Sequence, residues 1–425
     1  MASRGLGEVA RLARDATVLA AGSIVGAALS FLVWVFLART IPAEDYGALG
    51  AAFAFVALFQ LFGDLGLNYY AIREGSKDAA RAAHVFRDLL GLKLALLGGA
   101  TVLCGALALV LPFRASERGL ILAFLATLPI FGLAAYLACL CNVHRRMSRL
   151  ATIQVAERAG YAALVPAAVG VGLGATGAAL AAVASAILYA GLASAATRKL
   201  RGGPLWPPSP SSAWRPHMTT AFQFGIAAIL ATVQQRIDVV LLAILADPTS
   251  LAHYVAAAQV FFLLLLLASG VAQAAFPWLV PRLNRGEVPL RRIGMWTVAL
   301  ALLATLVAGG ASLAASSVFP FLFGANLGTG AALFQILVWA FVPALASIPA
   351  ALALDALNLQ KVHVANAAVM AGITVALDAV WIPTLGAMGA AWATVAGWMF
   401  GLFGGVPIAF VVLRRHIGRS AATRK

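Results

Sequence analysis

Long apolar stretches recur along the whole of this sequence, and each is long enough to cross a lipid bilayer. About 20 helical residues cross the hydrocarbon core of a bilayer, where only a helix can pair all the backbone groups of a single segment. Twelve stretches reach this length: 16–38, 47–72, 89–113, 118–141, 149–173, 175–196, 218–246, 250–280, 292–319, 328–356, 363–383 and 387–413. The sequence therefore predicts an all-α polytopic membrane protein with about twelve transmembrane helices.

The composition leaves little room for anything else. Only 11% of the 425 residues are charged, against about 25% in soluble domains, and 62% are hydrophobic. The predicted loops are short, and they show no nucleophile–base pair, metal cluster or phosphate-binding loop at usable spacing. We therefore expect no enzymatic activity, no cofactor and no metal site.

The basic residues predict the orientation of the spans. The formal net charge is +15, and 26 of the 30 Lys and Arg residues fall in the N-terminal tail, 73–93, 142–158, 197–217, 281–292, 357–363 and the C-terminal tail. The opposite side holds Arg39, Arg114 and Arg118. Because basic residues gather on the cytoplasmic side of spans, both termini are expected to be cytoplasmic. This distribution also explains the positive charge without a nucleic-acid partner.

One basic cluster follows the second predicted span. Its members are Arg73, Lys77, Arg81, Arg87 and Lys93. Ordinary positive-inside topology is the favoured explanation, and a guide for anionic lipid head groups is the functional alternative.

A charged, proline-rich segment divides the chain into two similar halves. Residues 198–217 contain Pro204, Pro207, Pro208, Pro210 and Pro216, which is typical of a semi-rigid linker. We expect six-helix bundles at 1–197 and 218–425, joined by this cytoplasmic linker. Residues 36–42, followed by Tyr46, pair with 244–249, followed by Tyr254, at an offset of about 208. Because six spans is an even number, both halves have the same orientation, which makes this a parallel repeat. The alternative is a chance similarity between Ala- and Leu-rich helices.

A polar stripe is predicted within the second span. Residues 47–72 are expected to form one unbroken helix, on which Gln60, Asp64 and Asn68 recur every four residues and share a face. Hydrocarbon offers these side chains no partner, so the face must contact protein or water.

Six charged residues are predicted to lie well inside spans. They are Asp64, Glu157, Arg158, Arg236, Asp238 and Asp378. Each costs several kcal/mol in hydrocarbon unless it is paired or hydrated, so together they predict a polar cavity between helices. The segment Gln234-Gln235-Arg236-Ile237-Asp238 is the densest polar patch in any span. Arg236 is suited to contact a phosphate, but pairing with Asp238 or Asp64 explains it equally well. For Glu157 and Arg158 a structural role is favoured.

Several segments together resemble the polysaccharide-biosynthesis flippases of the multidrug/oligosaccharidyl-lipid/polysaccharide exporter superfamily. They are Arg39 with Pro42, Tyr46-Gly47, Asp64-Leu65-Gly66-Leu67, Arg73-Glu74, Ile237-Asp238 with Tyr254, and residues 382–391. One departure is Asp378, where the family often carries a neutral asparagine. The resemblance implies two six-helix bundles around a central cavity, in the plasma membrane of a bacterium.

The resemblance also implies a function. It implies a flippase that moves an undecaprenyl-pyrophosphate-linked oligosaccharide to the outer leaflet by alternating access. The substrate-binding residues expected in the cavity are Arg236, Asp238, Gln60, Asp64, Asn68, Gln235, Arg158 and Arg39. Of these, Arg236, with Arg158 and Arg39, is expected to attract the pyrophosphate, while Gln60, Asp64 and Asn68 bond sugar hydroxyls or a coupling ion. The coupling ion is left open between H⁺ and Na⁺, and we expect a monomer.

Two alternatives remain. A cation-coupled multidrug antiporter of the same superfamily would have a cavity dominated by acids and aromatics, against which Arg236 counts. A membrane-embedded glycan polymerase or ligase would need a large outward loop with acidic or histidine residues, and the predicted outward loops are only a few residues each.

Overall fold

The chain forms two compact units of helices. The computed structural model describes residues 2–78, 82–201, 203, 205–209, 218–285 and 287–422, and every regular element in these ranges is a helix. The first unit is Met1–Ile229 and the second is Leu230–Lys425, with the division inside α10 (Met218–Leu245). The predicted bundle limits at 197 and 218 stay a prediction.

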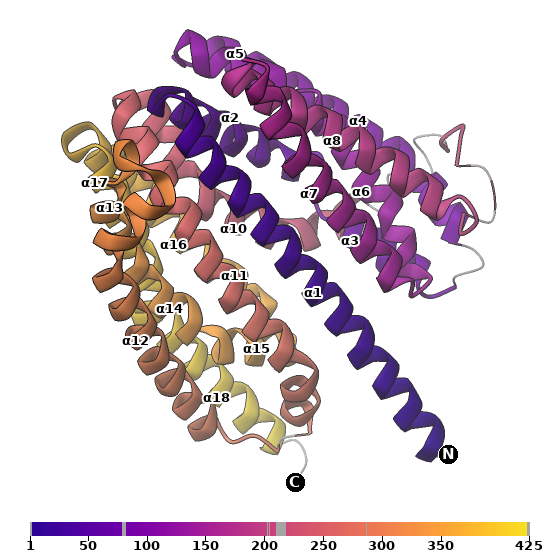
Figure 1. Ribbon diagram of the computed structural model, residues 1–425. Helices are drawn as coiled ribbons and strands as arrows, with labels where there is room; N and C mark the ends of the chain where they lie inside the picture. The colour runs from indigo at the N-terminus through magenta and orange to yellow at the C-terminus, as the bar shows by residue number, and fades with distance from the viewer. Residues whose placement is uncertain are drawn as a thin grey trace. The chain divides into compact units, whose positions relative to one another are not determined.

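The first unit is built from antiparallel helices joined by short turns. Its helices are α1 (Ala2–Thr40), α2 (Ala43–Phe62), α3 (Leu67–Gly75), α4 (Ala82–Val110), α5 (Ala115–Phe124), α6 (Thr127–Val143), α7 (Met147–Gly170), α8 (Gly174–Thr197) and the first part of α10. Helix α7 packs between α1 and α8, while α6 packs against both α4 and α8 (Figure 1). The Cβ position of Gly22 on α1 lies 3.1 Å from Ala151 Cβ on α7, so a small residue permits this close helix packing.

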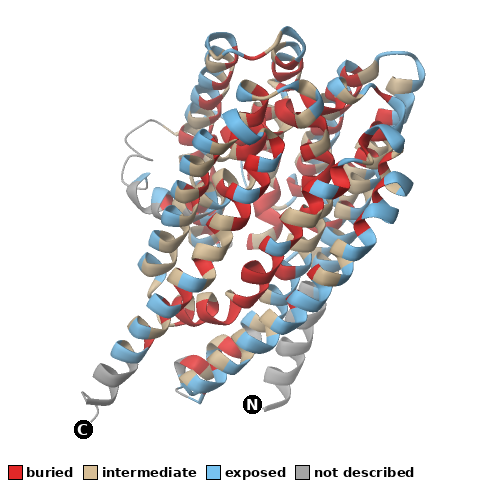
Figure 2. Ribbon diagram, turned by 90° about the vertical axis from the view of Figure 1, so that its left-hand side faces the viewer, coloured by how far each residue is buried: buried red, intermediate tan, exposed pale blue. Residues whose placement is uncertain are grey.

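The second unit follows the same plan. Its helices are the end of α10, α11 (Pro248–Asn284), α12 (Leu290–Phe323), α13 (Gly330–Leu337), α14 (Phe341–Ala346), α15 (Ile348–Ala356), α16 (Gln360–Leu385), α17 (Ala387–Phe400) and α18 (Val406–Ala422). Short 3₁₀ turns join α12 to α13 and α13 to α14, and a π-helical turn at Gly401–Gly405 joins α17 to α18. In each unit the buried residues lie on helix faces turned into the bundle (Figure 2).

Eleven helical segments of the described chain are long and apolar enough to cross a membrane. The predicted span that is missing from these eleven is 149–173, which corresponds to α7, a helix of 24 residues and so as long as α8. Its central Glu157 and Arg158 make it less apolar than the others. The protein is therefore an all-α, multi-pass membrane protein, as predicted.

Two buried tyrosines lie near the start of a helix, one in each unit. Tyr46 lies in the first turn of α2, after Pro42, and Tyr254 lies in the second turn of α11, after Asp247 and Pro248. Both tyrosine side chains are 0% exposed. These are the residues that the predicted repeat pairs at an offset of 208.

The second predicted span is not one unbroken helix, which corrects the sequence analysis. Helix α2 ends at Phe62, and α3 begins at Leu67 after a turn in which Leu65 and Gly66 have φ of 43° and 78°. The turn forms where α10 comes into backbone contact: a Cβ on Gly66 would lie 2.4 Å from the amide nitrogen of Gly225. A left-handed glycine makes both the turn and this approach possible.

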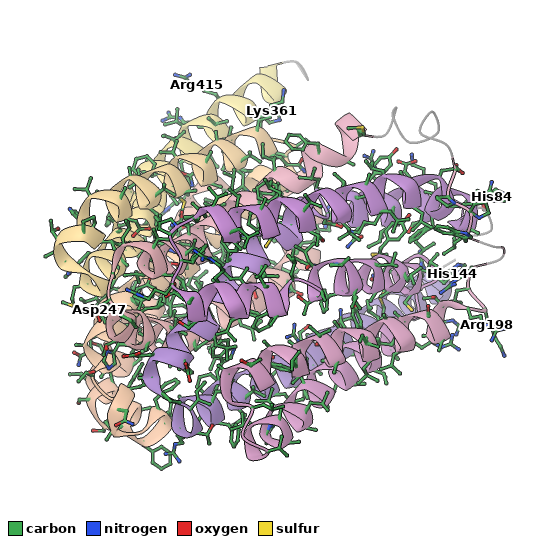
Figure 3. The ribbon with its side chains drawn as sticks, turned by 90° about the horizontal axis from the view of Figure 1, so that it is seen from above. His84, His144, Arg198, Asp247, Lys361 and Arg415 are labelled. Atoms are coloured by element: carbon green, nitrogen blue, oxygen red, sulfur yellow. The ribbon has the colours of Figure 1, made fainter. Side chains whose placement is uncertain are left out.

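Three connections that carry basic residues lie at one end of the first unit. His84 near the start of α4, His144 after α6 and Arg198 after α8 lie together at that end (Figure 3). In the second unit Figure 3 separates Asp247, before α11, from both Lys361 and Arg415. Arg81 of the predicted basic cluster lies outside the described residues.

Part of the linker is anchored on the first unit. Leu205 is 7% exposed and belongs to a core cluster with Phe86 and Tyr136. The Ser209 hydroxyl donates to Asp88 Oδ1 of α4 at 2.5 Å. Residues 202, 204 and 210–217 lie outside the described residues.

Candidate functional site

An acidic centre lies inside the second unit, where α10, α11 and α17 meet. Asp238 is 4% exposed, and its Oδ1 accepts the backbone N–H of Val239 at 2.7 Å. Its Oδ2 accepts a short hydrogen bond from the Tyr254 hydroxyl and a second from the Thr394 hydroxyl, the latter at 3.3 Å. Both carboxylate oxygens are thus held by groups from three helices, so the side chain has one fixed orientation.

A second buried carboxyl group lies within electrostatic range of the first. Asp378 on α16 is 0% exposed, and neither of its carboxyl oxygens has a hydrogen-bond partner among the described residues. An ionised Asp378 would repel an ionised Asp238, and its charge would also act on Tyr254. A buried ionised carboxylate without a partner is strongly unfavourable, so this pair of carboxyl groups calls for a proton or a cation.

The polar neighbours of this centre connect α10 to α16. Gln234 Nε2 donates to the Thr374 hydroxyl at 2.9 Å, and both residues are buried. The other amide atom, Gln234 Oε1, is buried and accepts no hydrogen bond from the described part of the chain. Gly397 on α17 leaves the space for this contact, because a Cβ there would lie 2.1 Å from Thr374 Oγ1.

The predicted ligand Arg236 lies on the same helix as Asp238. Its guanidinium carbon is 4.2 Å from the centroid of the Phe262 ring on α11, in cation–π geometry. Arg236 and Gln235 are both half-buried. An aromatic face stabilises an arginine that is partly removed from water.

A buried ion pair lies inside the first unit. Lys93 Nζ on α4 lies 2.6 Å from Asp64 Oδ1 in the turn between α2 and α3, and the Lys93 side chain is 1% exposed. This corrects the assignment of Lys93 to the basic surface cluster. The lysine belongs to the interior of the unit, where it neutralises Asp64.

The break in the second span separates the three members of the predicted polar stripe. Gln60 lies on α2, Asp64 in the turn and Asn68 on α3, so they do not share one helix face. Gln60 faces α6, where a Cβ on Gly132 would lie 3.2 Å from its amide nitrogen. The Asn68 Oδ1 atom is buried with no hydrogen-bond partner in the ranges that the structure describes.

Asp64 also lines a small pocket within the first unit. The cavity measures about 250 Å³. Its walls are Asp64, Leu65, Leu67, Leu92, Leu96, Met218, Ala221 and Phe222. Apart from the one carboxylate, the lining side chains are apolar.

The remaining predicted ligands lie elsewhere in the first unit. Glu157 on α7 is 8% exposed and accepts the Ser185 hydroxyl of α8 at 3.0 Å. Arg158 Nε lies 3.2 Å from Glu157 Oε2, but 41% of the Arg158 side chain remains exposed. Arg39 is exposed at the end of α1. The cavity that these residues and Arg236 were predicted to share stays a prediction.

Four participants were missed as site residues from the sequence: Lys93, Tyr254, Thr374 and Thr394. The repeat had already singled out Tyr254, and its spacing of 16 residues from Asp238 placed it on the next helix. Nothing in the pattern of Thr374 or Thr394 distinguishes them from other hydroxyl residues in apolar helices. In the described chain no group of three or more His, Cys, Asp or Glu residues is arranged to hold a metal ion.

Comparisons with known proteins identify the family. Residues 12–281, more than half of the chain, match the family described as Polysaccharide biosynthesis protein. A search of curated proteins gives no match.

Solved structures of membrane transporters have the same fold. The lipid II flippase MurJ in an inward closed conformation superposes with a TM-score of 0.76 over 94% of this chain and 87% of its own, at 11% sequence identity. An inward-facing multidrug resistance MATE family transporter gives a TM-score of 0.73 over 95% of this chain and 96% of its own, at 18% sequence identity. A MOP superfamily transporter from Pyrococcus furiosus, described as having a binding pocket of reverse polarity, gives a TM-score of 0.65 over 97% of this chain and 96% of its own, at 17% sequence identity. With the sequence match to the family and the transporter fold of the MOP superfamily both in hand, we conclude that the chain belongs to the polysaccharide biosynthesis protein family.

Proposed function

We propose that this protein is a flippase that translocates an undecaprenyl-pyrophosphate-linked oligosaccharide across the bacterial plasma membrane by alternating access. The family is one of polysaccharide biosynthesis, and the fold is that of flippases and exporters. The observation that carries the proposal is Arg236, a cation in the middle of a membrane helix whose guanidinium rests on the Phe262 ring. A pyrophosphate is the part of such a substrate that would cross hydrocarbon least readily, and a fixed guanidinium is suited to bind it.

The roles of the other predicted ligands follow from their positions. Arg158 keeps much of its side chain accessible although Glu157 lies beside it, so it is the second candidate for a phosphate contact. Asp64 is neutralised by Lys93, which suits it to bond sugar hydroxyls rather than to hold a free cation. Gln60, Asn68, Gln235 and Arg39 are assigned to the same translocation path.

We assign the coupling ion, H⁺ or Na⁺, to the acidic centre of the second unit. Asp238 and Asp378 supply four carboxyl oxygens, and the Tyr254 and Thr394 hydroxyls lie beside those of Asp238. Oxygen ligands of this kind suit a small hard cation, and either carboxyl group can instead hold a proton. Binding one positive charge would relieve the repulsion between the two carboxylates.

The basic ends of the units give the proposed orientation. The connections marked by His84, His144 and Arg198 would face the cytoplasm, and both termini would lie on that side. The protein is proposed to act as a monomer in which the two units rearrange around the substrate.

Reconstituted flipping tests the proposal. The wild type and Arg236→Ala are placed in liposomes with a fluorescent undecaprenyl-pyrophosphate saccharide, and the fraction that becomes accessible to an external reductant is followed. Arg236→Ala should reduce the flipping rate at least tenfold, Arg236→Lys should retain part of it, and Arg415→Ala should match the wild type. Normal flipping by a correctly inserted Arg236→Ala protein removes the proposed role of Arg236. If the wild type flips no such lipid but exports cationic dyes, the antiporter function takes its place.

A further inference from the structure

The turn between α11 and α12 carries a strongly basic surface that the proposed function does not use. Its four arginines are Arg282, Arg285, Arg291 and Arg292. Arg285 Nε lies 2.5 Å from Glu287 Oε1, so this pair is neutralised within the turn. Arg291 and Arg292 are exposed in the first turn of α12. The turn therefore keeps an excess of positive charge at the surface.

Two tryptophans lie directly beside these arginines. Trp278 on α11 and Trp296 on α12 have ring centroids 5.5 Å apart and tie the two helices together. The guanidinium carbon of Arg282 is 4.4 Å from the Trp278 ring centroid, and its Nη1 donates to the Trp278 carbonyl at 3.0 Å. Two contacts with Trp278 thus hold Arg282 in place. The hydrogen bond uses only one of the five N–H donors of the guanidinium.

The exposed face of α12 changes character in a fixed order along the helix. Arg292, Trp296, Ala299, Leu303 and Leu306 follow one another at spacings of three and four residues and so lie on one stripe. Leu303 and Leu306 are 52% and 74% exposed, and the stripe is aliphatic beyond Trp296. At 1.5 Å per residue, Trp296 and Leu306 are about 15 Å apart along the axis, which is half of a 30 Å hydrocarbon core.

We propose that this surface binds one anionic phospholipid. The phosphate lies against Arg282 and Arg292, the glycerol region rests at the Trp278–Trp296 pair, and an acyl chain follows the aliphatic stripe of α12. This order of cation, aromatic and aliphatic groups matches the order of layers in one leaflet. The aliphatic stripe favours a lipid over a soluble anion, because a soluble anion would make no use of it. The positive charge favours an anionic lipid over a zwitterionic one.

Native mass spectrometry of the full-length protein tests the proposal. Phosphatidylglycerol and phosphatidylcholine with identical acyl chains are titrated into the detergent-solubilised protein. The first phosphatidylglycerol should bind more tightly than phosphatidylcholine. Arg282→Gln combined with Arg292→Gln should weaken it roughly 30-fold, from about fivefold for each arginine near an anionic lipid. The matched control removes two charges from the exposed Arg414 and Arg415 on α18, and it should bind phosphatidylglycerol like the wild type.

Fluorescence locates the lipid. Phosphatidylglycerol brominated on its acyl chains should quench the wild type more than a protein with Trp278→Phe and Trp296→Phe, while brominated phosphatidylcholine should show a much smaller difference. Equal affinity for the two lipids, or equal loss in the Arg414/Arg415 control, overturns the proposal. Displacement of phosphatidylglycerol by excess inorganic phosphate would overturn the assignment to a lipid, since it would show that the arginines recognise phosphate alone.

Discussion

Lys93 on α4 and Asp64 in the turn between α2 and α3 form an ion pair of 2.6 Å in which the lysine side chain is only 1% exposed. Moving both charges out of water costs several kcal/mol, and the attraction between them offsets this cost only while both are present. The pair therefore fixes the position of the turn relative to α4. It also leaves Asp64 without the free negative charge that a bare aspartate would have.

Replacing Lys93 alone should destabilise the first unit. Lys93→Met leaves Asp64 with an uncompensated charge, and a loss of about 3 kcal/mol in the free energy of unfolding is expected. The double substitution of Lys93→Met with Asp64→Asn removes both charges and should recover most of the loss. Denaturant unfolding of the detergent-solubilised protein measures both. A double variant that is as unstable as Lys93→Met would show that packing around the lysine, rather than charge, explains the loss.

The contact between Gly225 and the turn predicts a second effect. A Cβ on Gly225 would lie 2.4 Å from the carbonyl carbon of Leu65, and a backbone atom cannot rotate away as a side chain can. Gly225→Ala should therefore push α10 off the turn and lower the free energy of unfolding by about 2 kcal/mol. Gly98→Ala on α4 is the matched control, because a Cβ there meets nothing within 4 Å. If the two alanine variants unfold alike, the close approach at Gly225 does not limit stability.

The break between α2 and α3 could not be predicted from the sequence of that segment alone. The segment 47–72 is apolar, and Gly63 and Gly66 alone do not end a helix in a bundle. The helix ends where α10 meets it, and the contacting residue, Gly225, lies far along the chain. Span length and order could be read from hydropathy, because the bilayer imposes them locally. Where a helix bends depends on a neighbour that local patterns do not reveal.

Lys93 was misplaced for a related reason. The sequence placed the start of its span at residue 89, so the lysine seemed to lie at the membrane surface. Helix α4 begins at Ala82, which places Lys93 about 16 Å from that end. Asp238, by contrast, was recognised because a charge in mid-span has few alternatives to a polar site. Its partners Tyr254 and Thr394 come from two other helices, and only the packing of those helices brings them together.

Replacing Asp378 should change ion coupling without lowering stability. Neither of its carboxyl oxygens has a hydrogen-bond partner within the described chain, so Asp378→Asn removes no such contact and should leave the free energy of unfolding unchanged or higher. The same variant should lose the dependence of flipping on Na⁺ or on the proton gradient. Flipping is measured in liposomes with each gradient imposed in turn. Retention of the wild-type ion dependence would exclude Asp378 from the coupling site.

Asp238→Ala should behave differently from Asp378→Asn. It leaves the Tyr254 hydroxyl and the Thr394 hydroxyl without their shared acceptor inside the second unit. Each unpaired buried donor costs about 1 to 3 kcal/mol, so a loss of at least about 2 kcal/mol in the free energy of unfolding is expected. Asp238→Asn keeps an acceptor oxygen at the same place and should lose less. Equal stability of the alanine and asparagine variants would contradict the hydrogen-bonded role of Asp238.

The start of α11 predicts a local dependence on pH. Asp247 caps this helix by accepting the Ser250 amide at 2.8 Å, and the Ser250 hydroxyl and amide hold the pKa of Asp247 below its usual value. A lowered pKa stabilises the folded state above the ordinary aspartate pKa of about 3.9, and this stabilisation is lost as the pH falls through the folded value. Amide exchange in the first turn of α11, corrected for intrinsic rates, should therefore accelerate below about pH 4 in the wild type. Asp247→Asn also caps the helix but does not titrate, so its corrected exchange rate should not change across this pH range. Asp247→Ala should exchange faster at every pH, because it loses about 1 kcal/mol of capping free energy. A wild type as flat as Asp247→Asn would show that the ionised carboxylate contributes nothing beyond its hydrogen bond.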